Sequence, residues 1–219
     1  KNSFELIIPA RDADRFLEES NSLVNSEEQI TFLDEMFVNH PDMKIVKDNT
    51  MRKYVKNYDN NIFYFDEINN CLEIIKQKLK LPIDISLHPK HNYLEASKKF
   101  RFNISKSTTL QAVSKSKLVI AHSSTSINFA ILLKKPIILY ESEAHKYSSY
   151  HRDLIRAFQR ELGLKLLNKG TILNFDFTKI CIDTEKYQDY IEKNLLPRGL
   201  MLPSYKIINN FINKKNNFN

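Results

Sequence analysis

Short apolar runs alternate with segments of helical periodicity through most of this chain, and this alternation limits its fold more than any other feature. Residues 117–121 (KLVIA) and 136–140 (PIILY) are β-branched runs typical of buried strands, and residues 125–135 between them are typical of a helix. Parallel strands need such crossovers, and strands covered on both faces are continuously apolar. The sequence therefore predicts an α/β fold, doubly wound and Rossmann-like, with a mainly parallel sheet.

The remaining segments predict further elements of the same kinds. Apolar residues three and four positions apart predict an amphipathic helix over residues 61–79, and Pro82 follows its end. Other helices are predicted over residues 13–24, 107–116, 144–163, 185–196 and 204–215. Strands are predicted over residues 4–10, 29–35 and 179–183, and from residue 83 onward.

Glycine is almost absent from the chain. Only three glycines occur in 219 residues, at positions 163, 170 and 199. This excludes the G-x-G-x-x-G dinucleotide turn and the G-x-x-x-x-G-K-[ST] phosphate loop. Any phosphate site must therefore be built from other residues.

The net charge bears on the class of partner, and the cysteines bear on the cellular location. The formal net charge is +7, but the basic residues form no stripe with interleaved aromatics, so we expect no nucleic-acid partner. A basic overall composition and attraction to an anionic partner, such as a phosphorylated donor or anionic lipid headgroups, explain this charge equally well. Two widely separated cysteines, Cys71 and Cys181, and no membrane-spanning apolar run indicate a cytoplasmic protein, with peripheral association with the inner membrane as a possibility.

Polar side chains follow the predicted strands at the point where each strand ends. His122 and the four hydroxyl residues Ser123, Ser124, Thr125 and Ser126 come directly before a predicted helix. A helix N-terminus attracts phosphate, and one of Ser123, Ser124 or Thr125 can cap the helix while the others donate to a ligand. Because ligands gather at the carboxyl ends of parallel strands, this turn is a candidate anion site.

A neighbouring strand end carries His88, Pro89 and Lys90. Proline disfavours helical conformation at His88 and keeps the chain extended there. His88 is therefore a candidate donor to a phosphate or leaving-group oxygen and a candidate catalytic residue, and Lys90 adds a positive charge.

Carboxylates follow two further strand ends. Asp34 and Glu35 are candidate catalytic bases, although either could cap the next helix instead. Glu141 is a candidate acceptor for ribose hydroxyls, as acidic residues are in nucleotide-binding folds. Arg11 and Asp12 could face the same site, and so could His151 and Arg152. No metal-binding spacing such as HExxH is present, so we predict no metal.

A strand ending in His-Pro, then a strand ending in a Ser-Ser-Thr cluster before a helix and a Lys-Pro-Ile return, resembles the donor half of GT-B glycosyltransferases. The pattern is most similar to bacterial sialyltransferases and polysialyltransferases, with their HP and SS/T motifs, and to capsule Kdo transferases. The resemblance covers about residues 29–140, with motifs at Phe32–Asp42, His88–Tyr93 and Ala121–Ile137.

The resemblance implies a GT-B donor-domain fold and a metal-independent glycosyltransferase of bacterial surface glycans. In those families the HP histidine and the SS/T hydroxyls bind the donor, and here these positions are His88, Ser123, Ser124 and Thr125. The implied partners are a nucleotide sugar, with a CMP-activated acidic sugar such as sialic acid favoured, and a glycan acceptor; no further cofactor is required.

Two alternatives stay open: a CDP-glycerol-type glycerophosphotransferase and a non-catalytic α/β binding module. The resembling families place their catalytic carboxylate in an N-terminal acceptor domain, and the residues before Phe32 are too few for such a domain. We expect an N-terminal segment or interdomain linker over residues 1–27, a nucleotide-sugar-binding domain over 28–200, and a C-terminal helix with a basic tail over 201–219.

Overall fold

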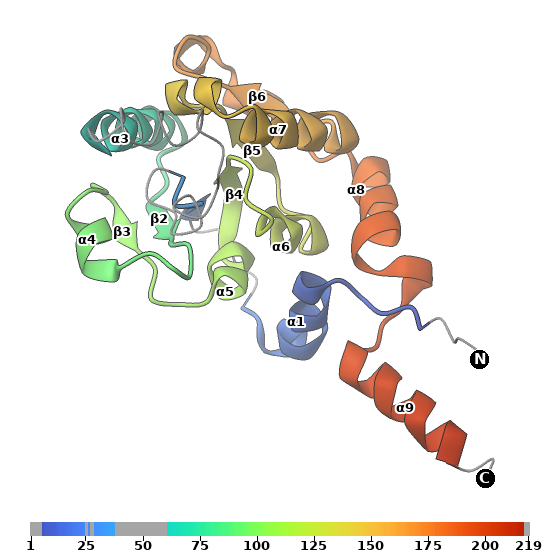
Figure 1. Ribbon diagram of the computed structural model, residues 1–219. Helices are drawn as coiled ribbons and strands as arrows, with labels where there is room; N and C mark the ends of the chain where they lie inside the picture. Colours follow the sequence, from blue (N-terminus) through green and yellow to red (C-terminus); the bar gives the residue numbers. More distant parts are fainter. Residues whose placement is uncertain (1–5, 25, 27–28, 38–60, 217–219) are drawn as a thin grey trace.

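A single parallel sheet with helices on both faces organises the computed structural model (Figure 1), which describes residues 6–24, 26, 29–37 and 61–216. The predicted α/β, doubly wound fold is confirmed, because every strand pair in the described residues is parallel. The strands lie in the order β3-β2-β1-β4-β5-β6. They are β1 Gln29–Leu33, β2 Ile83–Ser86, β3 Asn103–Ile104, β4 Ser116–Ala121, β5 Ile137–Tyr140 and β6 Lys165–Leu167.

Each face of the sheet is buried under its own helices. Alternate strand residues, such as Phe32 and Ile120, face a core formed with α3 (Asn61–Leu79). The opposite set, such as Leu33 and Val119, packs with the helices of the other face. These are α1 Arg11–Glu19, α5 Thr109–Ser114, α6 Ile127–Leu132, α7 Ser149–Leu162 and α8 Thr184–Tyr190. The short helix α4 (Tyr93–Ser97) follows β2.

The strand order reverses between β1 and β4. The chain runs outward from β1 through β2 to β3, then returns to β4 on the other side of β1. Phe32 of β1 pairs with Ile120 of β4, so the residues after both strands emerge side by side. In open parallel sheets this reversal point forms a crevice at the carboxyl ends of the strands, where ligands bind.

Several predicted elements differ from those observed. The helix over residues 61–79 is confirmed as α3, whereas residues 6–10 of the predicted first strand have no regular structure. The predicted helix over 144–163 is divided into a 3-10 turn, η3 (Glu143–Tyr147), and α7. The predicted strand over 179–183 is wrong, because β6 lies earlier and pairs with β5. The His40–Asp42 part of the first motif lies outside the described residues.

Two of the described helices end at a lysine in the left-handed conformation, where glycine is usual: Lys80 after α3 and Lys134 after α6. Lys134 has φ of 51° and closes α6 with two bonds, Lys134 N–H to Ile131 O at 3.0 Å and Lys135 N–H to Ala130 O at 2.8 Å. This is the Schellman arrangement, which usually places glycine at that position. α7 ends in the usual way, at Gly163 with φ of 66°.

The C-terminal helix α9 (Ser204–Asn216) extends away from the body of the domain in Figure 1. Three of its apolar side chains, those of Tyr205, Ile208 and Ile212, are exposed and lie three and four positions apart. Ser204 N–H donates to Asp14 Oδ1 at 2.7 Å and so joins the start of α9 to α1. Among the helices of the described ranges, none combines the length and the apolar character that crossing a bilayer requires.

Candidate functional site

A cavity of about 1010 Å³, with polar and apolar lining residues, opens at the reversal point of the sheet. Of the residues predicted from the sequence, Glu35, His88, Pro89 and the turn Ser123–Ser126 line this cavity. Asp34, Lys90, His122 and Glu141 are not among its lining residues. The structure therefore brings together two of the motifs that lie far apart in the sequence, His88-Pro89 and Ser123–Ser126.

The beginnings of four helices border the cavity. The α1 and α7 helices contribute their first turns, with Arg11, Asp12 and Tyr150 among the lining residues, and α5 and α6 contribute Thr109 and the Ser123–Ser126 turn. The N-cap residue of α1 is Ala10, whose side chain cannot cap it. Helix N-termini carry unpaired N–H groups and partial positive charge, so the cavity is suited to an anion.

Glu35 joins the end of β1 to the end of β4. Its Oε2 accepts hydrogen bonds from Ser123 N–H at 2.9 Å and from Ser123 Oγ at 2.5 Å. Its Oε1 accepts one from His145 Nε2 at 2.8 Å. Ser142 N–H donates to His145 Nδ1 at 3.1 Å, so Nδ1 is the acceptor and Nε2 carries the proton. The carboxylate thus fixes both the serine turn and η3.

The charge of Glu35 is stabilised by these partners. Burial acts to raise its pKa, but the hydrogen bond from His145, attraction to the His122 and His145 rings, and the hydrogen bonds from Ser123 hold the pKa far below the ordinary value of 4.5. A carboxylate with so low a pKa is a weak proton acceptor at neutral pH. The geometry therefore gives Glu35 a holding function, and its predicted role as a catalytic base stays a prediction.

Asp34 joins the end of β1 to the turn after β2. Its Oδ2 accepts hydrogen bonds from His91 Nδ1 at 2.7 Å and from His88 N–H at 3.3 Å. The side chain is 1% exposed and lies behind the cavity wall, so it positions His88-Pro89. Its predicted catalytic role likewise stays a prediction.

His88 lines the cavity with a defined tautomer. Lys90 N–H donates to His88 Nδ1 at 3.2 Å, so the proton of the neutral ring is on Nε2. A ring held in this way is able to donate a hydrogen bond from Nε2, which is the role predicted for it. Lys90 itself is exposed and contributes its backbone to this turn.

The serine turn presents hydroxyls to the cavity without capping α6. The prediction that Ser123, Ser124 or Thr125 caps the helix is wrong: the N-cap residue is Ser126, and its side chain makes no capping bond. Instead Ser124 Oγ accepts a hydrogen bond from Ser126 N–H at 3.3 Å. Within the described structure, no hydrogen bond engages the hydroxyls of Thr125 and Ser126, which therefore remain available to a ligand.

His122 is buried beneath this turn. Its Nδ1 donates to the carbonyl oxygen of Tyr140, and its Nε2 accepts from the hydroxyl of Tyr64 at 3.2 Å. Burial, together with the neighbouring His145, lowers the pKa of His122 to about 4, so the ring is neutral at physiological pH. Both ring nitrogens are engaged, and His122 supports the end of β4 from within the protein.

The predicted ribose acceptor, Glu141, also lies apart from the cavity lining. Glu141 is the first residue after β5, and its carboxylate forms an ion pair with Arg156 at 2.9 Å. A role in ribose binding stays a prediction for this residue.

Other residues of the cavity carried no clear signal in the sequence. Arg15 lines it from α1, and Asn128 lines it from α6. Asn128 Nδ2 donates to Asp12 Oδ2 at 2.9 Å, a contact between residues 116 positions apart that fixes α1 against α6. Arg11 and Asp12, weighed from the sequence as possible site residues, do face the cavity, as does His151.

A carboxylate and two imidazoles come close enough together to suggest a metal site. Glu35, His122 and His145 each place a possible ligand atom within 4.8 Å of the others. Their atoms already form hydrogen bonds with Ser123, Tyr140 and Tyr64, and a metal ion would have to displace some of these bonds. The observed arrangement fits a hydrogen-bond network better than a metal centre, and metal independence stays a prediction.

Comparison with known proteins finds distant structural likenesses and no family. The sequence matches no protein-family model, and no curated protein matches it significantly. The β-Kdo 2,7-transferase KpsC of Thermosulfurimonas dismutans is a structural neighbour at 14% identity and a TM-score of 0.38, over 93% of this chain and 61% of that one. UDP-GlcNAc 2-epimerase of Methanocaldococcus jannaschii, in complex with UDP-GlcNAc and UDP, aligns at 15% identity and a TM-score of 0.37, over 85% and 53%. The chain spans less than two thirds of either protein, and neither likeness is close enough to indicate an activity.

Proposed function

We propose that this chain is a glycosyltransferase, or its donor domain, and that it binds the phosphate of a nucleotide sugar in the cavity at the reversal point of the sheet. The observation that carries the proposal is the convergence of phosphate-binding chemistry on that cavity. The first turns of α1 and α7, the hydroxyls of Ser123–Ser126, and the side chains of Arg11 and His88 all line it. Backbone N–H groups, hydroxyls and guanidinium groups are the usual partners of phosphate oxygens.

The cavity also has the capacity for a ligand larger than inorganic phosphate. Its volume of about 1010 Å³ is at the upper end of the roughly 300–1,000 Å³ typical of small-molecule sites. Phe37, Phe129 and Leu154 supply apolar surface beside the polar groups. A nucleotide sugar combines a flat base, hydroxyls and phosphate in one molecule, and this mixed lining suits all three.

The chemistry follows from where negative charge develops. In transfer by displacement at the anomeric carbon, the bond to the nucleotide phosphate breaks and charge accumulates on the departing oxygen. A proton donor on His88 Nε2, together with hydroxyls at Thr125 and Ser126, would stabilise that charge from fixed positions. Holding those donors in place is the contribution of Asp34 and Glu35.

The choice of donor rests on the resemblance of the His-Pro and Ser-Ser-Thr motifs alone. On that basis we propose a CMP-activated acidic sugar such as sialic acid, and a bacterial surface glycan as the acceptor. Isothermal titration calorimetry of the folded protein with CMP, CDP, UDP and GDP tests the proposal. We expect binding, with CMP the tightest; binding of none of the four would refute a nucleotide site.

Substitution of the histidine at the cavity gives the first prediction. We expect His88→Ala to weaken CMP binding about tenfold, equivalent to roughly 1.4 kcal/mol, because one hydrogen bond to a charged oxygen is lost. The melting temperature should change little, since the His88 ring is only partly buried. Tyr93→Ala, at an exposed position outside the cavity, is the matched control. Equal CMP affinity in wild type and His88→Ala would remove His88 from the site.

The cytoplasmic location and peripheral attachment to the membrane remain proposals as well. The exposed side chains of Tyr205, Ile208 and Ile212 on α9 support attachment, because helices that lie in a membrane interface bury such a stripe among the lipid headgroups. The net charge of +7 would favour anionic lipids.

A further inference from the structure

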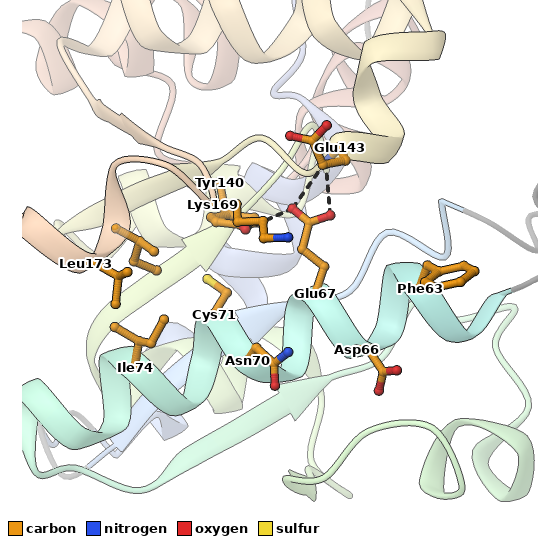
Figure 2. A pocket seen from close by; sticks show the side chains of 11 residues that line it. Phe63, Asp66, Glu67, Asn70, Cys71, Ile74, Tyr140, Glu143, Lys169 and Leu173 are labelled. Carbon is orange, nitrogen blue, oxygen red and sulfur yellow. Dashed lines mark hydrogen bonds between the residues drawn. The ribbon is translucent and has the colours of Figure 1, made fainter.

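A second cavity, of about 460 Å³, lies on the α3 face of the sheet near the end of β5. Figure 2 shows its walls: α3 runs along one side with Glu67 and Cys71 pointing into the space, and Lys169 and Leu173 approach from the chain beyond β6. Tyr140, the last residue of β5, lies at the back. No residue that lines the first cavity lines this one.

The polar groups of this cavity are mainly hydrogen-bond acceptors. Asp66, Glu67 and Asn70 come from α3, and Glu143 comes from η3. Arg101 neutralises Asp66 at 2.8 Å, and Lys146 neutralises Glu143 at 2.5 Å. Lys169 is exposed, and within the described structure no ion pair engages it. The cavity therefore offers acceptors on one side and an ammonium donor on the other.

Glu67 is held rigidly at the centre of the polar wall. Its Oε1 accepts a hydrogen bond from the Tyr140 hydroxyl at 2.9 Å. Glu143 N–H donates to both carboxylate oxygens, at 3.2 and 3.1 Å (Figure 2). A carboxylate has about four acceptor positions, so capacity remains for a ligand. Burial is the main cause that raises the pKa of Glu67 above its ordinary value.

Apolar side chains border the cavity at its two ends (Figure 2). Phe63 is 66% exposed and Leu173 is 60% exposed, and both line the cavity. Exposed large apolar side chains beside a cavity are typical of binding surfaces. An aromatic face packs well on the C–H face of a ring, while carboxylate, amide and ammonium groups bind the hydroxyls at its edge.

We propose that this second cavity is a saccharide-binding site, in which Phe63 stacks on a sugar ring while Glu67 and Lys169 bind its hydroxyls. Hydroxyls both donate and accept, so one sugar matches acceptors and donor together. The chemistry disfavours other small ligands. A phosphate would meet the carboxylate of Glu67, beside those of Asp66 and Glu143 that Arg101 and Lys146 already pair, and a metal ion would lie beside the ammonium of Lys169.

The position of η3 relates the two cavities. Glu143 at its start lines the saccharide cavity, and His145, two residues later, holds Glu35 at the first cavity. That the saccharide belongs to a glycan acceptor or product rests on the proposed function, whereas saccharide binding itself does not.

Saturation-transfer difference NMR with lactose and with N-acetylglucosamine, followed by titration for affinity, tests the proposal. We expect wild type to bind at least one of these sugars, and Phe63→Ala and Lys169→Met each to weaken that binding about tenfold, equivalent to roughly 1.4 kcal/mol. Both side chains are exposed, so their replacement should leave folding intact. Tyr93→Ala and Lys165→Met, at exposed positions outside both cavities, are the matched controls.

Two results would overturn the inference: no binding of either sugar by the folded wild type, or binding that Phe63→Ala and Lys169→Met leave unchanged. CMP titrated into the same variants separates this inference from the proposed function. Saccharide binding without CMP binding would leave the second site standing and remove the nucleotide site. CMP binding without saccharide binding would support the nucleotide site and remove the saccharide site.

Discussion

Replacing Glu35 by glutamine tests whether this residue holds the cavity together. The change preserves shape and removes the charge, and an amide has one acceptor and one donor end. If the amide oxygen takes over the two bonds from Ser123, the NH₂ group faces the Nε2 proton of His145. A switch of the His145 tautomer would only move the mismatch, because Ser142 N–H already donates to Nδ1. One buried donor is therefore left without an acceptor in either arrangement.

The size of the effect follows from these contacts. A hydrogen bond to a charged group contributes about 1.5–3 kcal/mol, and an unsatisfied buried donor costs about 1–3 kcal/mol. Relief from burying a charge offsets part of this, so we expect Glu35→Gln to lower the free energy of unfolding by about 2–4 kcal/mol. For a domain of this size that corresponds to a melting temperature lower by roughly 4–16 °C.

The stability difference between wild type and Glu35→Gln should also depend on pH, which provides a second test. The pKa of Glu35 is lowered in the folded protein from an ordinary value of 4.5, so the unfolded chain takes up the proton first as the pH falls. The stability that the carboxylate contributes is therefore complete above the unfolded pKa and is lost progressively as the pH falls below it. The difference between wild type and Glu35→Gln should be full at pH 7 and shrink below about pH 4.5.

Urea unfolding followed by circular dichroism at several pH values measures this difference. Glu18→Gln, at an exposed position on α1, is the control for loss of one carboxylate and should change stability little at any pH. A Glu35→Gln protein within about 0.5 kcal/mol of the control at pH 7, or a difference that does not depend on pH, would refute the reasoning.

Two further predictions concern the end of α6 and the exposed apolar stripe of α9. Lys134→Gly should raise the melting temperature by about 1–4 °C. Left-handed backbone costs an ordinary residue about 1–2 kcal/mol and the Lys134 side chain is exposed, while the greater freedom of glycine in the unfolded chain offsets about 0.5–1 kcal/mol of the gain. Lys115→Gly, at the right-handed C-cap of α5, should lower the melting temperature, and stabilisation by both variants or by neither would contradict the reasoning. Wild type should co-sediment with phosphatidylglycerol vesicles and Ile208→Asp should bind them about tenfold less, because a charge replaces part of the apolar stripe. Asn209→Asp controls for the added charge, and equal losses in the two variants would remove the stripe from membrane binding.

The sequence predicted the fold wherever local pattern decides structure. The spacing of apolar residues placed α3 within its observed limits, and the β-branched runs placed β4 and β5. The edge strand β6 was missed because three residues carry too little periodicity, and only pairing with β5 makes them a strand. Residues 179–183 alternate as a strand would, but in the described part of the chain they pair with no neighbouring strand and form none.

The candidate site was predictable only in part, and for a related reason. His88-Pro89 and Ser123–Ser126 follow strands, so the rule for parallel sheets placed them at one edge. Arg15 reaches the cavity only because α1 packs on α6, through contacts such as that between Asp12 and Asn128. The bond from His145 to Glu35 joins residues 110 positions apart, and no local pattern indicates it.

The pair Asp34-Glu35 shows why two adjacent carboxylates belong at this point of the fold. The strand order reverses at β1, so the chain segments after β2 and β4 diverge from its two sides and need a common anchor. Asp34 binds the backbone of His88 on one side, and Glu35 binds the backbone and hydroxyl of Ser123 on the other. Because glycine supplies no phosphate loop here, the cavity depends on side chains held at fixed positions, and these carboxylates hold both of its walls. Loss of either charge should therefore loosen one wall and leave the other in place, which distinguishes anchors from a catalytic base, whose loss would abolish transfer without moving the donor site.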